Sequence, residues 1–145
     1  TMGTCIMPAA VDKVSKSDSY LIAATGPAVL QNKINKIVKE KGHETNVLDT
    51  ICEVMDDSEY ECLVLAVSYD RKLILVDSNG APTDLTEVDF WAIGCCQEMV
   101  LGRLLYIAEQ RSVTIEDAEA AIVMAAKYDN GIDGRVKRFV LDRSI

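Results

Sequence analysis

Leu63-Val64-Leu65-Ala66-Val67 and Leu73-Ile74-Leu75-Val76 are two stretches in which both sets of alternate residues are apolar. Successive side chains of a β-strand point to opposite faces of a sheet, so a strand with one wet face would alternate apolar with polar residues. These two stretches therefore predict strands in a sheet that is covered on both faces. The polar residues Tyr69-Asp70-Arg71 between them predict the turn that joins the strands.

Outward from this strand pair, blocks of strands alternate with pairs of helices. Apolar residues recur at helical spacing on both sides of the pair, and turn and capping residues mark the helix ends. Strands are also predicted at Thr4–Met7, Ser19–Ala24, Val88–Ile93 and Arg135–Asp142, and helices at Val29–Lys41, Asn46–Met55, Gln97–Glu109 and Thr114–Lys127. Helix pairs between strand blocks fit four layers, with helices outside and two sheets inside. The predicted fold class is therefore α+β, as a four-layer αββα sandwich.

The composition favours one packed domain over residues 1–145. Of the 145 residues, 49% are apolar and 26% are charged, a balance that excludes a disordered chain. The net charge of −8 would repel nucleic acid and anionic lipid, so neither is expected as a partner. No apolar run in the sequence approaches the roughly 18 residues that a membrane span requires.

The cysteines favour reduced, buried thiols rather than a disulfide framework. Their number, five, is odd, no C-x-x-C pair occurs, and adjacent residues such as Cys95 and Cys96 rarely bridge without strain. His43 is a lone histidine in a polar stretch, which leaves little material for a transition-metal site. We therefore expect no metal and no cofactor. The reduced thiols, with no charged and then apolar leader, predict a cytoplasmic protein.

Four segments resemble, in order and spacing, the β-type subunits of proteasomes. Thr1–Met7 with Val11–Val14 resembles a strand pair that leads to a lysine, and Leu21–Gly26 resembles the small-residue strand end before the first long helix. Trp91–Cys96 is similar to an A-I-G-S-G-G segment before a later helix, and Ala125–Gly134 to a helix-terminal Asp followed by a glycine-rich loop. The resemblance covers the whole chain and implies the same αββα fold.

Proteasome β-type subunits are N-terminal nucleophile hydrolases, so the resemblance also implies a chemistry. The hydroxyl of an N-terminal Thr attacks a peptide carbonyl, and the α-amino group of the same Thr takes the proton. The resemblance assigns Lys13 to the lysine that keeps this amine neutral, and Asp129 to the carboxylate that supports it. It assigns the oxyanion-binding amide to Ala24 or Gly26, and Cys95 to the place of a supporting Ser.

Several of these residues also have purely structural interpretations. Lys13 would then be a solvated surface charge, Gly26 a turn glycine at the start of a helix, and Asp129 a turn residue at the end of one. A thiol at position 95 is a weaker hydrogen-bond partner than the hydroxyl it replaces, which argues against full activity. The catalytic assignment depends on the four segments being in register.

The start of the chain departs from the pattern of these proteins. Thr1 does not match their nucleophile, because only eleven residues separate it from Lys13. Those proteins place a β-hairpin of roughly 20 further residues before this point. We therefore expect the domain to lack its first β-hairpin, either because this sequence is part of a longer one or because the hairpin was lost. A third interpretation makes Thr1 itself the nucleophile of an abbreviated variant.

Two functions follow from the resemblance, and the sequence leaves both open. The first is a threonine-type peptidase subunit in a proteasome-like ring of identical or related subunits, which cleaves unfolded polypeptides delivered by an ATPase unfoldase. The second is a catalytically inactive structural homologue, either a ring subunit or a component of a phage particle. The short end after the last predicted strand resembles the bacterial HslV type and phage-encoded relatives.

Overall fold

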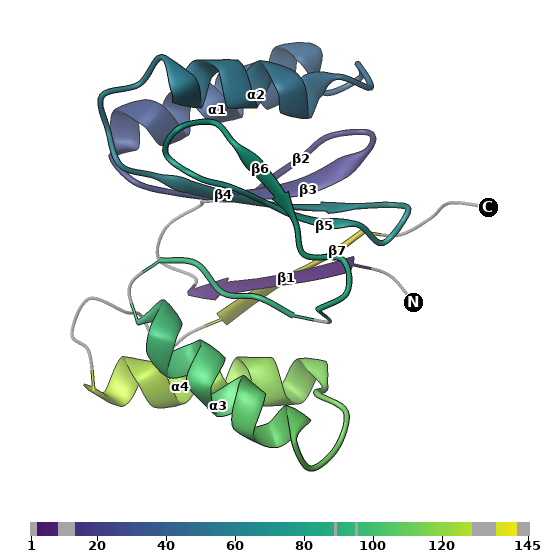
Figure 1. Ribbon diagram of the computed structural model, residues 1–145, viewed down its shortest axis with the longest axis vertical. Helices are drawn as coiled ribbons and strands as arrows, with labels where there is room; N and C mark the ends of the chain where they lie inside the picture. Colours follow the sequence, from purple (N-terminus) through teal and green to yellow (C-terminus); the bar gives the residue numbers. More distant parts are fainter. Residues whose placement is uncertain (1–2, 9–13, 89, 95, 129–135, 142–145) are drawn as a thin grey trace.

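The computed structural model describes residues 3–8, 14–88, 90–94, 96–128 and 136–141 (Figure 1). The described strands are β1 (Gly3–Pro8), β2 (Val14–Lys16), β3 (Tyr20–Thr25), β4 (Leu63–Ser68), β5 (Leu73–Val76), β6 (Pro82–Asp84) and β7 (Val136–Leu141). The described helices are α1 (Ala28–Lys41), α2 (Val47–Asp56), α3 (Gln97–Ala108) and α4 (Ile115–Tyr128). None of these four helices is long and apolar enough to cross a membrane.

Strands β2 to β6 form one antiparallel sheet in sequence order, with β4 at its centre. The register pairs Val14 with Ala23, Thr25 with Leu63, and Val64 with Val76. Along β4 the side chains alternate, Val64 and Ala66 being fully buried and Leu63 and Leu65 half-buried. Helices α1 and α2 lie over one face of the sheet, and β1 and β7 lie beneath the other (Figure 1). Both faces of this strand are thus covered, more tightly on the helix side.

The main core lies between the five-stranded sheet and helices α1 and α2. Ile22, Val64 and Ala66 contribute the sheet side of this core and are at most 1% exposed. The buried helix residues that pack against them are Leu30, Ile34, Val38, Val47, Leu48, Ile51 and Met55. Because burying one large aliphatic side chain is worth about 1.5–3 kcal/mol, this layer supplies much of the driving force for folding.

Strands β1 and β7 form a separate antiparallel pair, from Gly3 opposite Leu141 to Pro8 opposite Val136. In Figure 1 this pair lies between the five-stranded sheet and helices α3 and α4. A smaller core holds α3 and α4 together through Val100, Leu104, Ala121 and Ala125. The two alanines allow the helices to approach closely, because they present little side-chain volume between them.

The predicted strand at Val88–Ile93 is wrong. Within the described part of that range, residues 88 and 90–93, no strand forms, and the sheet is completed by β6 instead. The backbone N–H of Val88 donates to the carbonyl of Leu85 at 2.8 Å, which turns the chain away from the sheet. Phe90 and Ala92 then pack on the core between α3 and α4. The apolar residues of this range therefore serve a helix core rather than a strand.

The α+β class is confirmed, and the other predicted helices and strands occur at closely similar bounds. The start of α4 is a reciprocal cap, as its sequence indicated. The N–H of Thr114 donates to Oδ2 of Asp117 at 2.9 Å, and the N–H of Asp117 donates to Oγ1 of Thr114 at 3.2 Å. His43 is exposed in the turn after α1. The predicted turn at 130–134 lies outside the described residues.

Candidate active site

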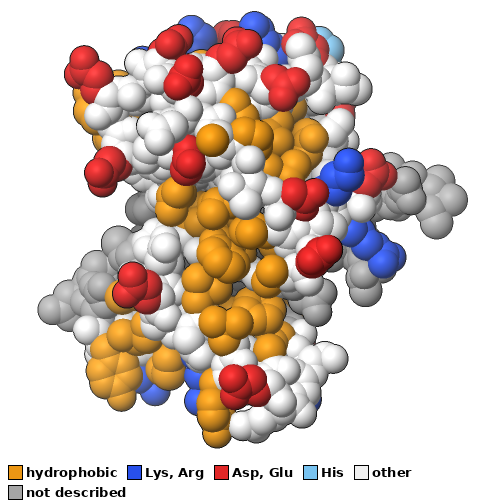
Figure 2. Space-filling model, viewed as in Figure 1, with side chains coloured by type: hydrophobic (Ala, Val, Ile, Leu, Met, Phe, Trp, Pro, Cys, Tyr) orange, Lys and Arg blue, Asp and Glu red, His pale blue; other side chains and the backbone are white. Residues whose placement is uncertain are grey.

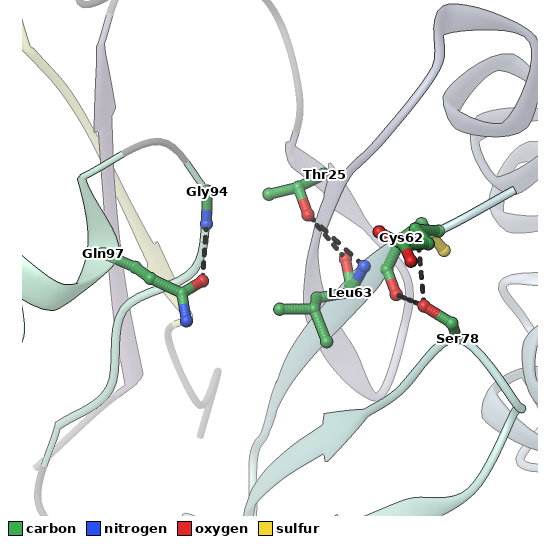
Figure 3. A pocket seen from close by; sticks show the side chains of 7 residues that line it. Thr25, Cys62, Leu63, Ser78, Gly94 and Gln97 are labelled. Atoms are coloured by element: carbon green, nitrogen blue, oxygen red, sulfur yellow. Dashed lines mark hydrogen bonds between the residues drawn. The ribbon is translucent and has the colours of Figure 1, made fainter.

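A pocket opens where the sheet ends close to the start of α3. Its volume is about 390 Å³. The residues that line it are Thr25 at the end of β3, Glu61, Cys62 and Leu63 at the start of β4, Ser78 after β5, and Gly94 and Gln97 at the start of α3. Figure 3 shows Gly94 and Gln97 on one side of the pocket and Cys62 and Ser78 on the other, with Thr25 between them.

Two hydroxyls in the pocket are engaged by the backbone at the end of the sheet. Oγ1 of Thr25 accepts from the N–H of Leu63 at 3.3 Å and lies 3.5 Å from the carbonyl oxygen of Leu63. Oγ of Ser78 accepts from the N–H of Cys62 at 3.0 Å and donates to the carbonyl of Cys62 at 3.0 Å. Both hydroxyls satisfy backbone groups where the strand ladder stops. Neither is therefore a suitable candidate for a nucleophile.

Gly26 forms the bend between β3 and α1 and requires the absence of a side chain. Its φ is +127°, a conformation that residues with a Cβ rarely adopt. A Cβ at this position would lie 2.7 Å from Cβ of Cys62 and 3.1 Å from the carbonyl oxygen of Glu61. The carbonyl of Gly26 accepts a hydrogen bond from Nε2 of Gln31 at 2.8 Å. The turn-glycine interpretation of Gly26 therefore has direct structural support.

Ala24 lies two residues before this bend, and its side chain points away from the space between the sheets. It is 5% exposed and belongs to the core that also contains Ile22 and Leu30. In the sheet register it lies opposite Val64 of β4. Any contribution of Ala24 to a site in the pocket would therefore come from its backbone.

The turn before α3 brings a second backbone segment to the same place. Gly94 has a φ of +104°, and Cys96 has a φ of +58°. The turn is closed by two hydrogen bonds, because the N–H of Gln97 donates to the carbonyl of Gly94 at 3.2 Å and the N–H of Gly94 donates to Oε1 of Gln97 at 3.2 Å. A Cβ on Gly94 would lie only 3.4 Å from Cγ2 of Thr25. Two of the segments singled out in the sequence, at 21–26 and 91–96, therefore meet in space.

The site residues predicted from the sequence divide into two groups. Ala24 and Gly26 are described, and they flank Thr25 of the pocket. Lys13, Cys95 and Asp129 lie outside the described residues, so their catalytic assignment stays a prediction. Ser78 and Gln97, which also line the pocket, were not predicted as site residues from the sequence. Ser78 lies in an ordinary turn sequence, and no local signal indicates that this turn reaches the end of β3.

Two described thiols, Cys62 in the pocket and Cys52 in α2, are not activated as nucleophiles. Burial raises the pKa of the Cys62 thiol above its ordinary value. Burial raises the pKa of Cys52 as well, with a contribution from the negative charge of Asp49. Both thiols are therefore protonated near neutral pH, and a protonated thiol is a poor nucleophile and metal ligand. Within the described residues, no three His, Cys, Asp or Glu side chains cluster closely enough to hold a metal ion.

No protein-family model matches the sequence, and no curated protein is similar to it in sequence. Solved structures nevertheless share its fold. Thiobacillus denitrificans BPH in complex with epoxomicin is 15% identical, with 98% of this chain and 93% of that chain covered and a TM-score of 0.73. Eukaryotic HslV from Trypanosoma brucei is 15% identical, with 97% and 93% covered and a TM-score of 0.70. Anbu, the ancestral β-subunit from Yersinia bercovieri, is 9% identical, with 94% and 75% covered and a TM-score of 0.67.

These similarities extend over nearly the whole chain while the sequences have diverged widely. They show that the chain has a proteasome-like fold, similar to those of HslV, BPH and Anbu, as the four sequence segments predicted. A fold hosts different chemistries, so the activity depends on the site rather than on the fold.

Proposed function

We propose that the chain is a threonine-type peptidase subunit of a proteasome-like ring, which cleaves unfolded polypeptides inside the assembly. Its fold is the four-layer αββα sandwich. The order of elements in Figure 1, with one helix pair beyond each sheet, supports this architecture. The proposal concerns the site at the end of β3, with Lys13, Ala24, Gly26, Cys95 and Asp129 in the roles that the resemblance implies.

The single observation that carries the proposal is the meeting of the β3 end with the turn before α3. Gly94 approaches Cγ2 of Thr25 there. Two of the assigned residues adjoin described segments in the sequence, since Cys95 follows Gly94 and Lys13 precedes Val14, which pairs with Ala23.

The chemistry divides among backbone amides, one cation and one carboxylate. The amide of Ala24 or Gly26 stabilises the oxyanion that forms when the peptide carbonyl is attacked. The ammonium group of Lys13 keeps the α-amine of the nucleophile neutral, so that the amine can accept the hydroxyl proton. Asp129 supports the amine. The nucleophile is the hydroxyl of the N-terminal residue of the processed protein.

Exposed apolar side chains support the ring assembly. Figure 2 shows apolar side chains gathered in a band down one face of the molecule towards the end that holds α3 and α4. On these two helices the exposed large apolar residues are Met99, Leu105, Tyr106, Ile115, Val123 and Tyr128. Exposed apolar surface favours contact with another protein. We propose copies of this chain, or related subunits, as the contact, and an ATPase unfoldase as the partner that delivers substrate.

Epoxomicin, which is bound to BPH in one of the similar structures, provides the test. We expect the native protein to gain the mass of one epoxomicin at its N-terminal residue. The intact mass before labelling identifies that residue. Replacing Lys13 by Ala should slow labelling about a hundredfold or more, because the amine would then be protonated. The matched control is Lys16→Ala, since Lys16 is exposed at the far end of β2 and should label at the native rate.

Absence of epoxomicin labelling and of cleavage would instead establish the alternative function, that of an inactive structural homologue. A native protein that assembles into rings but shows neither labelling nor polypeptide cleavage is an inactive structural homologue, whether a ring subunit or a phage-particle component. Equal labelling rates of Lys13→Ala and the native protein would remove Lys13 from the catalytic assignment.

A further inference from the structure

Gln97 lines the pocket, and the two ends of its side-chain amide have different surroundings. Oε1 accepts the hydrogen bond from the N–H of Gly94 at 3.2 Å. Oε1 and Nε2 are the two branches of the same planar amide. When Oε1 points towards the N–H of Gly94, Nε2 points away from it. No described residue accepts a hydrogen bond from Nε2, and no buried side-chain nitrogen or oxygen among them lacks a partner. Nε2 is thus a donor without a partner among the described residues, on a side chain that lines the pocket.

The other side-chain donors of the pocket are engaged. Oγ of Ser78 is bound to the backbone of Cys62 and Oγ1 of Thr25 to that of Leu63. The two hydrogen bonds between Gly94 and Gln97 hold the turn and the side chain in one arrangement. A donor fixed in this way loses little conformational entropy when it binds an acceptor. Gln97 thus presents one preorganised donor to whatever enters the pocket.

The charge around the pocket selects the kind of acceptor. Glu61 lines the pocket, and the chain as a whole has a net charge of −8. Both disfavour an anion such as a carboxylate or a phosphate. A neutral carbonyl oxygen has no such penalty and accepts from an amide N–H with ordinary geometry.

We propose that Gln97 is a substrate-binding residue whose Nε2 donates a hydrogen bond to a backbone carbonyl in an internal segment of the polypeptide. The class of substrate rests on the proposed peptidase function, whereas the donor rests on the geometry of the pocket. The same side chain positions the Gly94 turn through its oxygen. An internal segment is favoured over a chain end, because the carboxylate of a free C-terminus would be repelled.

Two substitutions separate the donor from the positioning role. Gln97→Glu keeps an oxygen for the N–H of Gly94 but removes the donor, whereas Gln97→Ala removes both. The probe is a fluorescein-labelled, unstructured peptide that is acetylated and amidated at its ends. We expect Gln97→Glu to keep the native melting temperature and to raise both KM and Kd about tenfold, the effect of one lost hydrogen bond. Gln97→Ala should weaken binding similarly and also lower the melting temperature.

Gln110→Glu is the matched control, because it makes the same change in charge at an exposed residue beyond the end of α3. It should bind the peptide as the native protein does. The same peptide with a free C-terminal carboxylate should bind no more tightly than the amidated form.

Native-like binding by Gln97→Glu would overturn the proposal, even if the protein cleaves the peptide. Tighter binding of the free acid would overturn the choice of an internal carbonyl. Peptide binding that depends on Gln97, without cleavage or epoxomicin labelling, would reject the peptidase function and uphold the role of Gln97. A protein that neither binds nor cleaves the peptide would reject both.

Discussion

The two helix pairs of this chain pack very differently. Helices α1 and α2 bury seven large or medium apolar residues against the five-stranded sheet, with Val47, Ile51 and Met55 fully buried. Helices α3 and α4 bury only Val100, Leu104 and two alanines, and leave large side chains such as Leu105 (54% exposed) and Tyr106 (57%) in solvent. The first pair completes the fold of a single chain. The second pair carries apolar surface that the described residues do not cover, which is the surface that the proposed contact with another subunit would bury.

The largest expected effect tests this contrast directly. Ile51 of α2 is fully buried between this helix and the sheet, so Ile51→Ala removes transfer free energy and leaves a cavity. We expect a loss of about 3 kcal/mol in the free energy of unfolding, measured by urea denaturation. Leu105→Ala on the other helix pair should change it by no more than about 0.5 kcal/mol, because the side chain is largely in water. Equal losses of unfolding free energy for the two substitutions would mean that both helix pairs are equally well packed within one chain.

Some elements of the fold could be predicted from the sequence and others could not. Strands such as Leu63–Val67 were predictable because two apolar faces leave few alternatives, and the Thr114–Asp117 cap was predictable because its residues are neighbours in the chain. The prediction of a strand at Val88–Ile93 was wrong, because the same apolar residues can pack on helices or in a sheet. Periodicity does not distinguish the two.

The site was predictable only in part. The segments ending at Gly26 and Cys96 were recognised from their small residues, and the structure brings them together. Ser78 and Gln97 were missed because their position in the pocket depends on where distant turns meet, which no local pattern records. The catalytic assignment of Lys13, Cys95 and Asp129 stays a prediction.

Substitutions of two glycines, one in each half of the molecule, should change the free energy of unfolding by intermediate amounts. Gly26→Ala forces a Cβ into a positive-φ bend and to 2.7 Å from Cβ of Cys62. We expect a loss of about 2 kcal/mol in the free energy of unfolding. Gly102 lies inside α3, and apart from its chain neighbours and the adjoining helix backbone no atom lies within 4 Å of where its Cβ would be. Gly102→Ala should therefore stabilise the monomer by about 0.5–1 kcal/mol, because alanine loses less backbone entropy. Stabilisation by both substitutions would show that the bend at Gly26 is not constrained by the core.

The smallest effect concerns how the second helix pair is held. Arg111, in the connection after α3, forms two hydrogen bonds with the carboxylate of Asp117 in the first turn of α4, at 2.6 and 2.7 Å. The Arg111 hydrogen bond, followed by the backbone N–H of Thr114, holds the pKa of the Asp117 carboxyl well below its ordinary value. A carboxylate whose pKa is depressed by folding stabilises the native state above its unfolded pKa. That stability is lost as the pH falls through the folded value.

Asp117→Asn should therefore be less stable than the native chain at pH 7, and the difference should shrink as the pH falls below about 4, the pKa of an unfolded Asp. Urea denaturation at several pH values measures it. Arg111→Gln supplies the control, because it removes the main cause of the shift and should flatten the pH dependence of the native Asp117. The contact is exposed on the arginine side, so its effect is modest and falls with added salt. A difference that does not vary with pH would mean that the charge of Asp117 does not stabilise the native state, and that its contacts with Arg111 and Thr114 act as those of a neutral side chain.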